Sequence, residues 1–174
     1  MKTELKFKFL QHLNRKKQNE GFTLLELLIV IIILGILAAI GLPSLLNQTA
    51  KAKQAEAKQN VGVVNRAQTA YRTENTAFAS SFDVLGIGIL TGSTSSTTTN
   101  YSYTIAGGSD TATIAATARD TALKAYSGGN SRIDEVISSL VCEAPSPGTT
   151  PPLTPAVSTT AAPPCPPNYN DLSK

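Results

Sequence analysis

The strongest constraint on the fold is a run of 16 consecutive residues without a polar side chain, Leu27 to Leu42. As a helix this run spans only about 24 Å, but the wider segment 22–46 spans about 37 Å and can cross a hydrocarbon core of about 30 Å. The alternative is the buried core helix of a globular domain. That alternative is disfavoured because the rest of the chain has too few apolar segments to surround a helix on all sides.

The positive charge of the chain is concentrated before this apolar run. Residues 1–21 hold six Lys or Arg against two Glu, a net +4, whereas the remainder holds nine basic and ten acidic residues, a net −1. The positive-inside rule therefore predicts a cytoplasmic N-terminus, with the C-terminal bulk outside the membrane. Because the part after residue 21 is slightly acidic, the basic pI does not indicate a nucleic-acid-binding surface.

A basic stretch followed by an apolar stretch is also typical of a secretory signal peptide. Such signals have a shorter apolar core and a cleavage site with small residues at alternate positions. Here the apolar run is followed by Leu42-Pro43-Ser44-Leu45-Leu46, which has no such site. We therefore expect the hydrophobic segment to remain in the mature protein.

The helix is predicted to continue beyond the apolar run, because residues 44–75 are rich in Ala, Gln, Lys and Glu. Apolar residues recur with the spacing of an amphipathic helix at Leu46, Ala50, Ala57, Val61, Val64 and Tyr71. A helix over 22–75 would be about 80 Å long. Gly35, Gly41 and Pro43 weaken its backbone ladder, which predicts a soft segment; an ordinary kink in a membrane helix is the alternative.

The segment after the helix changes to a composition rich in Thr, Ser and Gly. Residues 91–100 are predicted to form a loop. Two candidate strands, 101–106 and 111–118, flank a Gly-Gly-Ser-Asp turn. A third candidate strand, 136–143, follows a predicted turn at 128–130. The predicted fold class is α+β: a small antiparallel sheet packed on the second half of the long helix.

The C-terminal region is dominated by proline. Residues 145–167 hold nine of the ten prolines, which predicts a loop. The loop is bracketed by the two cysteines of the chain, Cys142 and Cys165, on the side predicted to lie outside the membrane. A disulfide there would stabilise the fold by about 3 kcal/mol in the chain-entropy model. Two unrelated thiols are the alternative.

The chain offers little to a catalytic mechanism. Its single histidine, His12, lies in the basic segment before the apolar run, and two cysteines do not make a metal cluster. The carboxylates Asp110, Asp120, Asp134 and Glu135 are expected at solvated turns or strand ends. The Gly-Gly pairs lack the Lys-Ser/Thr of a phosphate-binding loop. We therefore predict no enzyme, no metal site and no cofactor.

The segment Glu20-Gly21-Phe22-Thr23-Leu24-Leu25-Glu26, with a basic leader before it and an apolar helix after it, resembles the processing site of type IV prepilins. The resemblance implies that a dedicated membrane peptidase cuts after Gly21 and methylates the new N-terminus on Phe22. Glu26 would then be the fifth mature residue and Pro43 the twenty-second, both positions that match the family. These two residues are accordingly expected to act in assembly.

The resemblance is close over residues 1–75 and architectural beyond them, since pilin heads share a sheet on the long helix and often a C-terminal disulfide loop. The leader and residues 51–78 most resemble the pilins of cyanobacteria. The expected organisation is a leader at 1–21, a transmembrane and assembly half of the helix at 22–46, its amphipathic half at 47–75, a loop and sheet head at 76–144, and a Pro-rich loop and tail at 145–174.

The position of Glu26 in an apolar helix also indicates a functional role without reference to the family. A charged side chain inside a membrane helix costs a few kcal/mol unless it is paired or reaches the interface. In a filament it can pair with the methylated amine on Phe22 of a neighbouring subunit, in apolar surroundings that strengthen the attraction. The alternative is a carboxylate that reaches the membrane surface and has no further role.

The resemblance implies a structural subunit of a type IV pilus that serves motility, adhesion or DNA uptake. It would be an inner-membrane, single-pass precursor, processed by a prepilin peptidase and methyltransferase, delivered to pilus assembly platform proteins, and polymerised with its own copies into an extracellular helical filament.

Three alternatives to a pilus subunit stay open. A type II secretion pseudopilin would share residues 20–46 but usually lacks a C-terminal disulfide loop, so the two cysteines favour the pilus. A minor pilin with an adhesive or DNA-binding role is the second, although the head offers only the scattered basic residues Arg119, Lys124 and Arg132. A single-span membrane protein that does not assemble is the third, and Glu26 argues against it.

Overall fold

The computed structural model describes residues 22–173. The chain divides into two compact units, Met1–Leu46 and Asn47–Lys174. Helix α2, Leu24–Glu74, contributes to both of them. The predicted helix is thus present, and it ends one residue earlier than expected from the sequence.

In the first unit α2 presents its apolar side chains to the outside. The large apolar residues between Leu24 and Leu46 are between 43% and 83% exposed. This helix is long and apolar enough to cross a membrane, with a mean hydropathy of 3.0 over its most apolar window and none of that window buried. The alternative of a buried core helix is therefore wrong for this chain on its own. Pro43 lies inside the helix, and the soft segment ending there stays a prediction.

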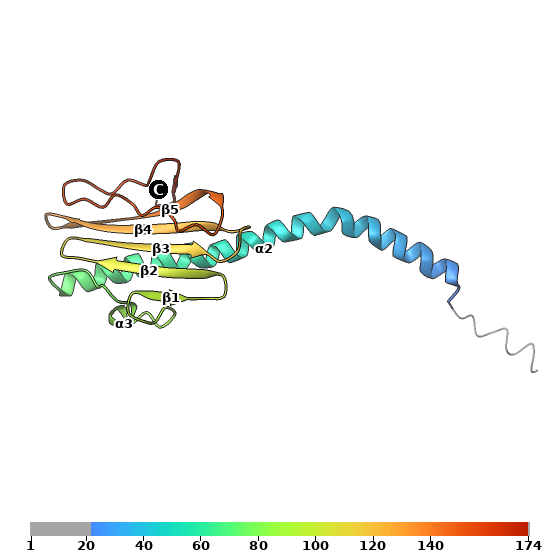
Figure 1. The fold of residues 1–174 in the computed structure, drawn as a ribbon, viewed down its shortest axis with the longest axis horizontal. Helices are drawn as coiled ribbons and strands as arrows, with labels where there is room; N and C mark the ends of the chain where they lie inside the picture. Colours follow the sequence, from blue (N-terminus) through green and yellow to red (C-terminus); the bar gives the residue numbers. More distant parts are fainter. Residues whose placement is uncertain (1–21, 174) are drawn as a thin grey trace, which may run out of the picture. The chain divides into compact units, whose positions relative to one another are not determined.

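The second unit is an antiparallel sheet of six strands in chain order, packed on the second half of α2 (Figure 1). The strands are β1 (Ser95–Thr97), β2 (Tyr101–Gly107), β3 (Thr111–Ala118), β4 (Lys124–Ile133), β5 (Val136–Pro147) and β6 (Asn170–Asp171). A short helix, α3 (Phe82–Leu85), precedes β1. This confirms the predicted α+β class.

The core lies between the helix and one face of the sheet. Ala57, Val61 and Val64 of α2 are at most 1% exposed, as their spacing predicts. They pack against apolar residues that alternate along β2 and β3 and against residues of α3, β4 and the connecting loops: Phe82, Leu90, Tyr101, Tyr103, Ile105, Ile114, Ala116, Ala118, Leu123 and Tyr126. The predicted stripe weakens at its two ends, since Leu46 is 65% exposed and Tyr71 is only half-buried.

The predicted turn at residues 128–130 is wrong, because these residues lie in the middle of β4. A Cβ atom on Gly128 would lie 2.8 Å from the side chains of Asn65 and Val61 on α2, and one on Gly129 would lie 2.9 Å from Val157 of the C-terminal loop. The strand is thus covered on both faces at close range. The two glycines permit this approach instead of reversing the chain.

Other boundaries also differ from the prediction. The expected loop 91–100 contains the short strand β1. Strand β5 runs on to Pro147, four residues past the predicted end, with Pro147 opposite Lys124. β6 pairs with β5 only at Cys142 and Glu143. The prolines that end β5 therefore lie beyond its pairing with β6, and Pro147 is the last residue of β5 in its ladder with β4, a position at a strand end where proline is tolerated.

Candidate functional site

The first candidate site is the start of α2. The backbone N and the Oγ1 of Thr23 both donate to Oε2 of Glu26, each at 2.9 Å, and the backbone N of Glu26 donates to Oγ1 of Thr23 at 3.2 Å. This is a reciprocal capping box, in which two side chains satisfy backbone N–H groups that a helix start leaves unpaired. This box was not predicted from the sequence, although the spacing Thr-x-x-Glu signals it.

The capping box bears on the predicted processing site. It fixes the Glu26 carboxylate four residues after Phe22, whose side chain is 81% exposed. Gly21, His12 and the rest of the predicted leader lie outside the described residues. The processing roles of Gly21 and Phe22 and the assembly roles of Glu26 and Pro43 therefore remain predictions.

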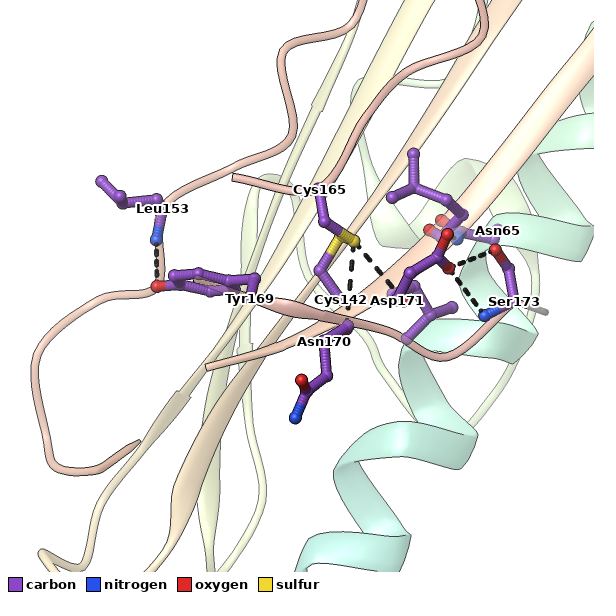
Figure 2. Close-up of a disulfide and its surroundings, with 10 residues drawn as sticks. Asn65, Cys142, Leu153, Cys165, Tyr169, Asn170, Asp171 and Ser173 are labelled. Atoms are coloured by element: carbon purple, nitrogen blue, oxygen red, sulfur yellow. Dashed lines mark hydrogen bonds between the residues drawn. A yellow bond between two sulfur atoms is a disulfide. The ribbon is translucent and has the colours of Figure 1, made fainter. Parts of the chain in front are cut away.

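The second candidate site is the C-terminal loop, which the predicted disulfide closes. Cys142 on β5 and Cys165 are bonded, with their Cα atoms 5.7 Å apart (Figure 2). The bond joins the buried centre of a long strand to the Pro-rich segment and so confirms the pairing expected from the sequence. Because Cys142 is fully buried, the attachment point lies within the head.

The C-terminal loop is held to the head by more than this bond. Leu172 N donates to Val141 O at 2.9 Å, and Leu153 N donates to the hydroxyl of Tyr169 at 3.0 Å, as Figure 2 shows for the second pair. Several of the prolines are themselves buried: Pro152, Pro155, Pro163 and Pro166. The loop therefore forms a cover over the outer face of β4.

Polar side chains join α2 to the sheet and to the segment that follows the helix. Gln68 donates from Nε2 to Ala79 O at 2.7 Å and accepts from Ala79 N at 2.9 Å. Asn65 donates to Leu140 O at 2.8 Å, and Asn130 donates to Asn65 O at 2.9 Å. These amides are at most 4% exposed. The hydrophobic stripe did not predict them, although polar residues at core-facing positions of a helix are the signal for such contacts.

Five charged side chains of the second unit take part in ion pairs. Asp110 accepts from Arg132 at 3.1 Å and lies 3.7 Å from Arg72. The hydrogen bond from Arg132, aided by one from Ser109, lowers the pKa of Asp110 below its usual 3.8. Lys124 pairs with Glu143 on the neighbouring strand.

Three buried tyrosines lie in the core near this pair. Burial raises the pKa of Tyr101, Tyr103 and Tyr126 above the usual 10. The hydroxyl of Tyr103 accepts a hydrogen bond from Asn60 at 2.9 Å, and that of Tyr101 donates to Lys124 O at 2.9 Å. These rings are therefore neutral parts of the core, with their hydroxyls satisfied.

The basic residues considered for DNA binding do not form a cluster. Arg132 and Lys124 are engaged in ion pairs, and Arg119 donates to Thr98 O at 3.0 Å. Within residues 22–173, no group of three His, Cys, Asp or Glu side chains is placed to hold a metal ion.

Two family models match the chain. The prokaryotic N-terminal methylation motif matches residues 16–42, which include the predicted cleavage site and the exposed apolar helix. The type IV pilin-like G and H family matches residues 54–166, which include most of the head and the loop closed by the disulfide.

Curated relatives match a shorter part. The chain is 41% identical over 69 residues to the type IV major pilin protein PilA of Myxococcus xanthus, which is 40% of this chain and 31% of that protein. It is 36% identical over 66 residues to the type II secretion system core protein G of Pseudomonas aeruginosa (38% of this chain, 46% of that protein), and 34% identical over 58 residues to that of Escherichia coli K12 (33% and 40%).

The chain thus spans less than half the length of these curated relatives. No solved structure matches the chain. The match to the type IV pilin-like G and H family nevertheless extends over more than half of the sequence, and the methylation motif includes the processing site predicted from the sequence. The chain therefore belongs to the type IV pilin-like G and H family, whose members are structural proteins and not enzymes.

Proposed function

We propose that this chain is a structural subunit of a type IV pilus, made as an inner-membrane precursor, cut between Gly21 and Phe22, methylated on Phe22 and polymerised through α2. The observation that carries the proposal is the exposed apolar half of this helix directly after the methylation motif. Its side chains cannot stay in water and are suited first to the bilayer and then to the apolar interior of a filament.

A type II secretion pseudopilin is the second candidate. The similarity to core protein G of several bacteria supports it, because the matched segments are about as long as that to the pilin PilA. The disulfide loop, Cys142 to Cys165, favours the pilus, since pseudopilin heads usually lack one. The resemblance of the leader and residues 51–78 to cyanobacterial pilins points the same way.

Mass spectrometry of filaments sheared from the cell surface tests the proposal. We expect an N-terminal peptide that begins at methylated Phe22, and the abundance of the chain would separate a major from a minor subunit. A surface protein that begins at Met1 or beyond Leu42 would contradict the pilin assignment. Recovery of the chain only from secretion complexes would favour the pseudopilin.

The proposed role of the Glu26 charge in assembly can be separated from the role of this side chain in the capping box. Glu26→Gln keeps an oxygen that can accept from Thr23 but removes the charge. We expect the variant to insert into the membrane and to fail in assembly, because the carboxylate can no longer pair with the methylated amine of a neighbouring subunit.

The matched control for the charge is Thr23→Val, which keeps the Glu26 carboxylate and removes the Thr hydroxyl from the box. It should retain most filaments, since a helix cap contributes only about 1 kcal/mol. Normal filament numbers in Glu26→Gln cells, at equal protein level, would show that the charge has no part in docking.

A further inference from the structure

The second unit carries unpaired charges of opposite sign in different places. Among the residues described there, the basic side chains without an ion pair or hydrogen bond all lie on α2: Lys51, Lys53, Lys58 and Arg66. The carboxylates without such a partner lie at the end of α2 and at the β4–β5 turn: Glu74, Asp134 and Glu135. Asp134 and Glu135 are the one adjacent pair among them.

Two of the unpaired cations border a groove of about 380 Å³ between α2 and the β5–β6 edge of the sheet. Lys58 and Arg66 flank it on the helix, and Val141 and Leu172 supply apolar walls. Gly62 leaves room between the two cations, and Nη1 of Arg66 lies only 3.7 Å from where a Cβ on Gly62 would be. The guanidinium therefore lies over the helix at the groove. We call these five residues the cationic groove.

The unpaired carboxylates form a projecting tip. Ile133 and Val136 are opposite each other in the β4–β5 ladder, so Asp134 and Glu135 alone make the turn between them. Both are exposed, and Val136 beside them is 66% exposed. The two carboxylates beside Val136 are complementary to the groove, where two cations lie beside the apolar side chains of Val141 and Leu172. We call Asp134, Glu135 and Val136 the acidic tip.

The acidic tip cannot reach the cationic groove of its own chain. The end of β4 that leads into the tip lies beside the last turn of α2. This is so because Arg132 of β4 and Arg72 of α2 both form ion pairs with Asp110. The groove is centred near Gly62, ten residues earlier on the helix, which corresponds to about 15 Å along the axis. A second copy displaced along the helix axis by a similar distance would bring its groove level with this tip.

We propose that the acidic tip of one subunit docks in the cationic groove of another copy of the same chain. The contact joins two different surfaces, so each bound subunit keeps one free tip or one free groove. Such a heterologous contact propagates into an open helical array when its rotation does not close a ring, whereas a self-complementary patch would close into a dimer. The inference rests on the proposed filament and names the head surfaces through which its subunits adjoin.

Charge accounts for the specificity of this contact. Exposed ion pairs contribute modestly to affinity, but like charges brought together cost several kcal/mol. Tip against tip and groove against groove are both repulsive. Charge therefore selects contacts between a tip and a groove, and the common direction of the heads comes from the proposed filament.

Charge reversal in cells that assemble the filament tests the proposal. The groove variant is Lys58→Glu with Arg66→Glu, and the tip variant is Asp134→Lys with Glu135→Lys. We expect each to lower the yield of sheared filaments at least about tenfold at unchanged precursor level, and the chain with all four substitutions to recover most of the yield. Recovery excludes misfolding, because that chain contains every substitution.

The matched control is Lys51→Glu with Lys53→Glu, which makes the same change in net charge on α2 outside the groove. It should leave the yield within about twofold of wild type. A loss as large as that of the groove variant would assign the effect to net charge and overturn the proposal. Wild-type yield from both reversed variants, or no recovery in the fourfold variant, would also overturn it.

A photo-crosslinking residue in place of Val136 gives a direct readout. In sheared filaments it should join the tip of one subunit to the segment 55–66 of another. Crosslinks confined to other segments would overturn the docking site while leaving the filament intact. Absence of the wild-type chain from filaments would instead refute the proposed function, and this inference with it.

Discussion

Replacement of Gly107 by alanine should strongly destabilise the head, although Gly107 has an ordinary backbone conformation. It is the last residue of β2, and a Cβ there would lie 2.1 Å from the carbonyl oxygen of Ala79 and 2.9 Å from that of Phe78. These are backbone atoms, and Ala79 is held by two hydrogen bonds to Gln68. The segment cannot move aside without losing them.

The magnitude follows from these contacts. Overpacking of a well-packed site costs about 1–3 kcal/mol, and we take the upper end because the clash is with backbone. Weakening of two hydrogen bonds adds about 1 kcal/mol each. The free energy of unfolding should therefore fall by about 3–5 kcal/mol, which for a unit of this size lowers Tm by roughly 10–20 °C.

The adjacent residue supplies the control. A Cβ on Gly108 would meet nothing closer than Thr111 O at 3.6 Å, which is ordinary contact. Gly107→Ala and Gly108→Ala remove the same backbone freedom from the unfolded chain, so the difference between their Tm values isolates the clash. The assay is thermal unfolding of the full-length chain in detergent micelles, followed by the near-UV signal of its tyrosines. Tm values within about 3 °C of each other would refute the reasoning.

Two further variants test the loop and the paired charges. Cys142→Ser with Cys165→Ser should lower the free energy of unfolding by about 2–4 kcal/mol and make residues 145–167 protease-sensitive; full maleimide labelling of the exported native chain before reduction would contradict this. Asp110→Asn should lower Tm at neutral pH. Because the pKa of Asp110 is lowered in the folded state, its contribution is present above pH 3.8 and is lost as the pH falls through the lowered value, where the two Tm values converge. Asp120→Asn is the control, since no ion pair holds that carboxylate.

The features that the sequence predicts well are those with local causes. An uninterrupted apolar run, alternation in β2 and β3 around a Gly-rich turn, and two cysteines that bracket prolines each specify their structure without reference to distant residues. The capping box at Thr23 and Glu26 belongs to this class too, because its spacing is visible in the sequence.

The features that the sequence did not predict depend on tertiary contacts. A Gly-Gly pair favours a turn when only neighbours are considered. In β4 the same pair is required because α2 packs on Gly128 and the C-terminal loop packs on Gly129. The amides of Asn65 and Gln68 are a similar case, since only their partners on the sheet and at Ala79 make burial favourable.

The division of the chain into two units has a consequence for how variants should behave. The second unit buries its own core and satisfies its buried amides internally, so changes at Gly107 or the disulfide act on folding. The apolar half of α2 buries nothing within its own chain, so its stabilisation must come from the bilayer or from other subunits. Substitutions near Glu26 should therefore change assembly without changing the melting of the head, and substitutions in the core should change melting first. A variant at Glu26 that lowered the Tm of the head would show that the two units are energetically coupled.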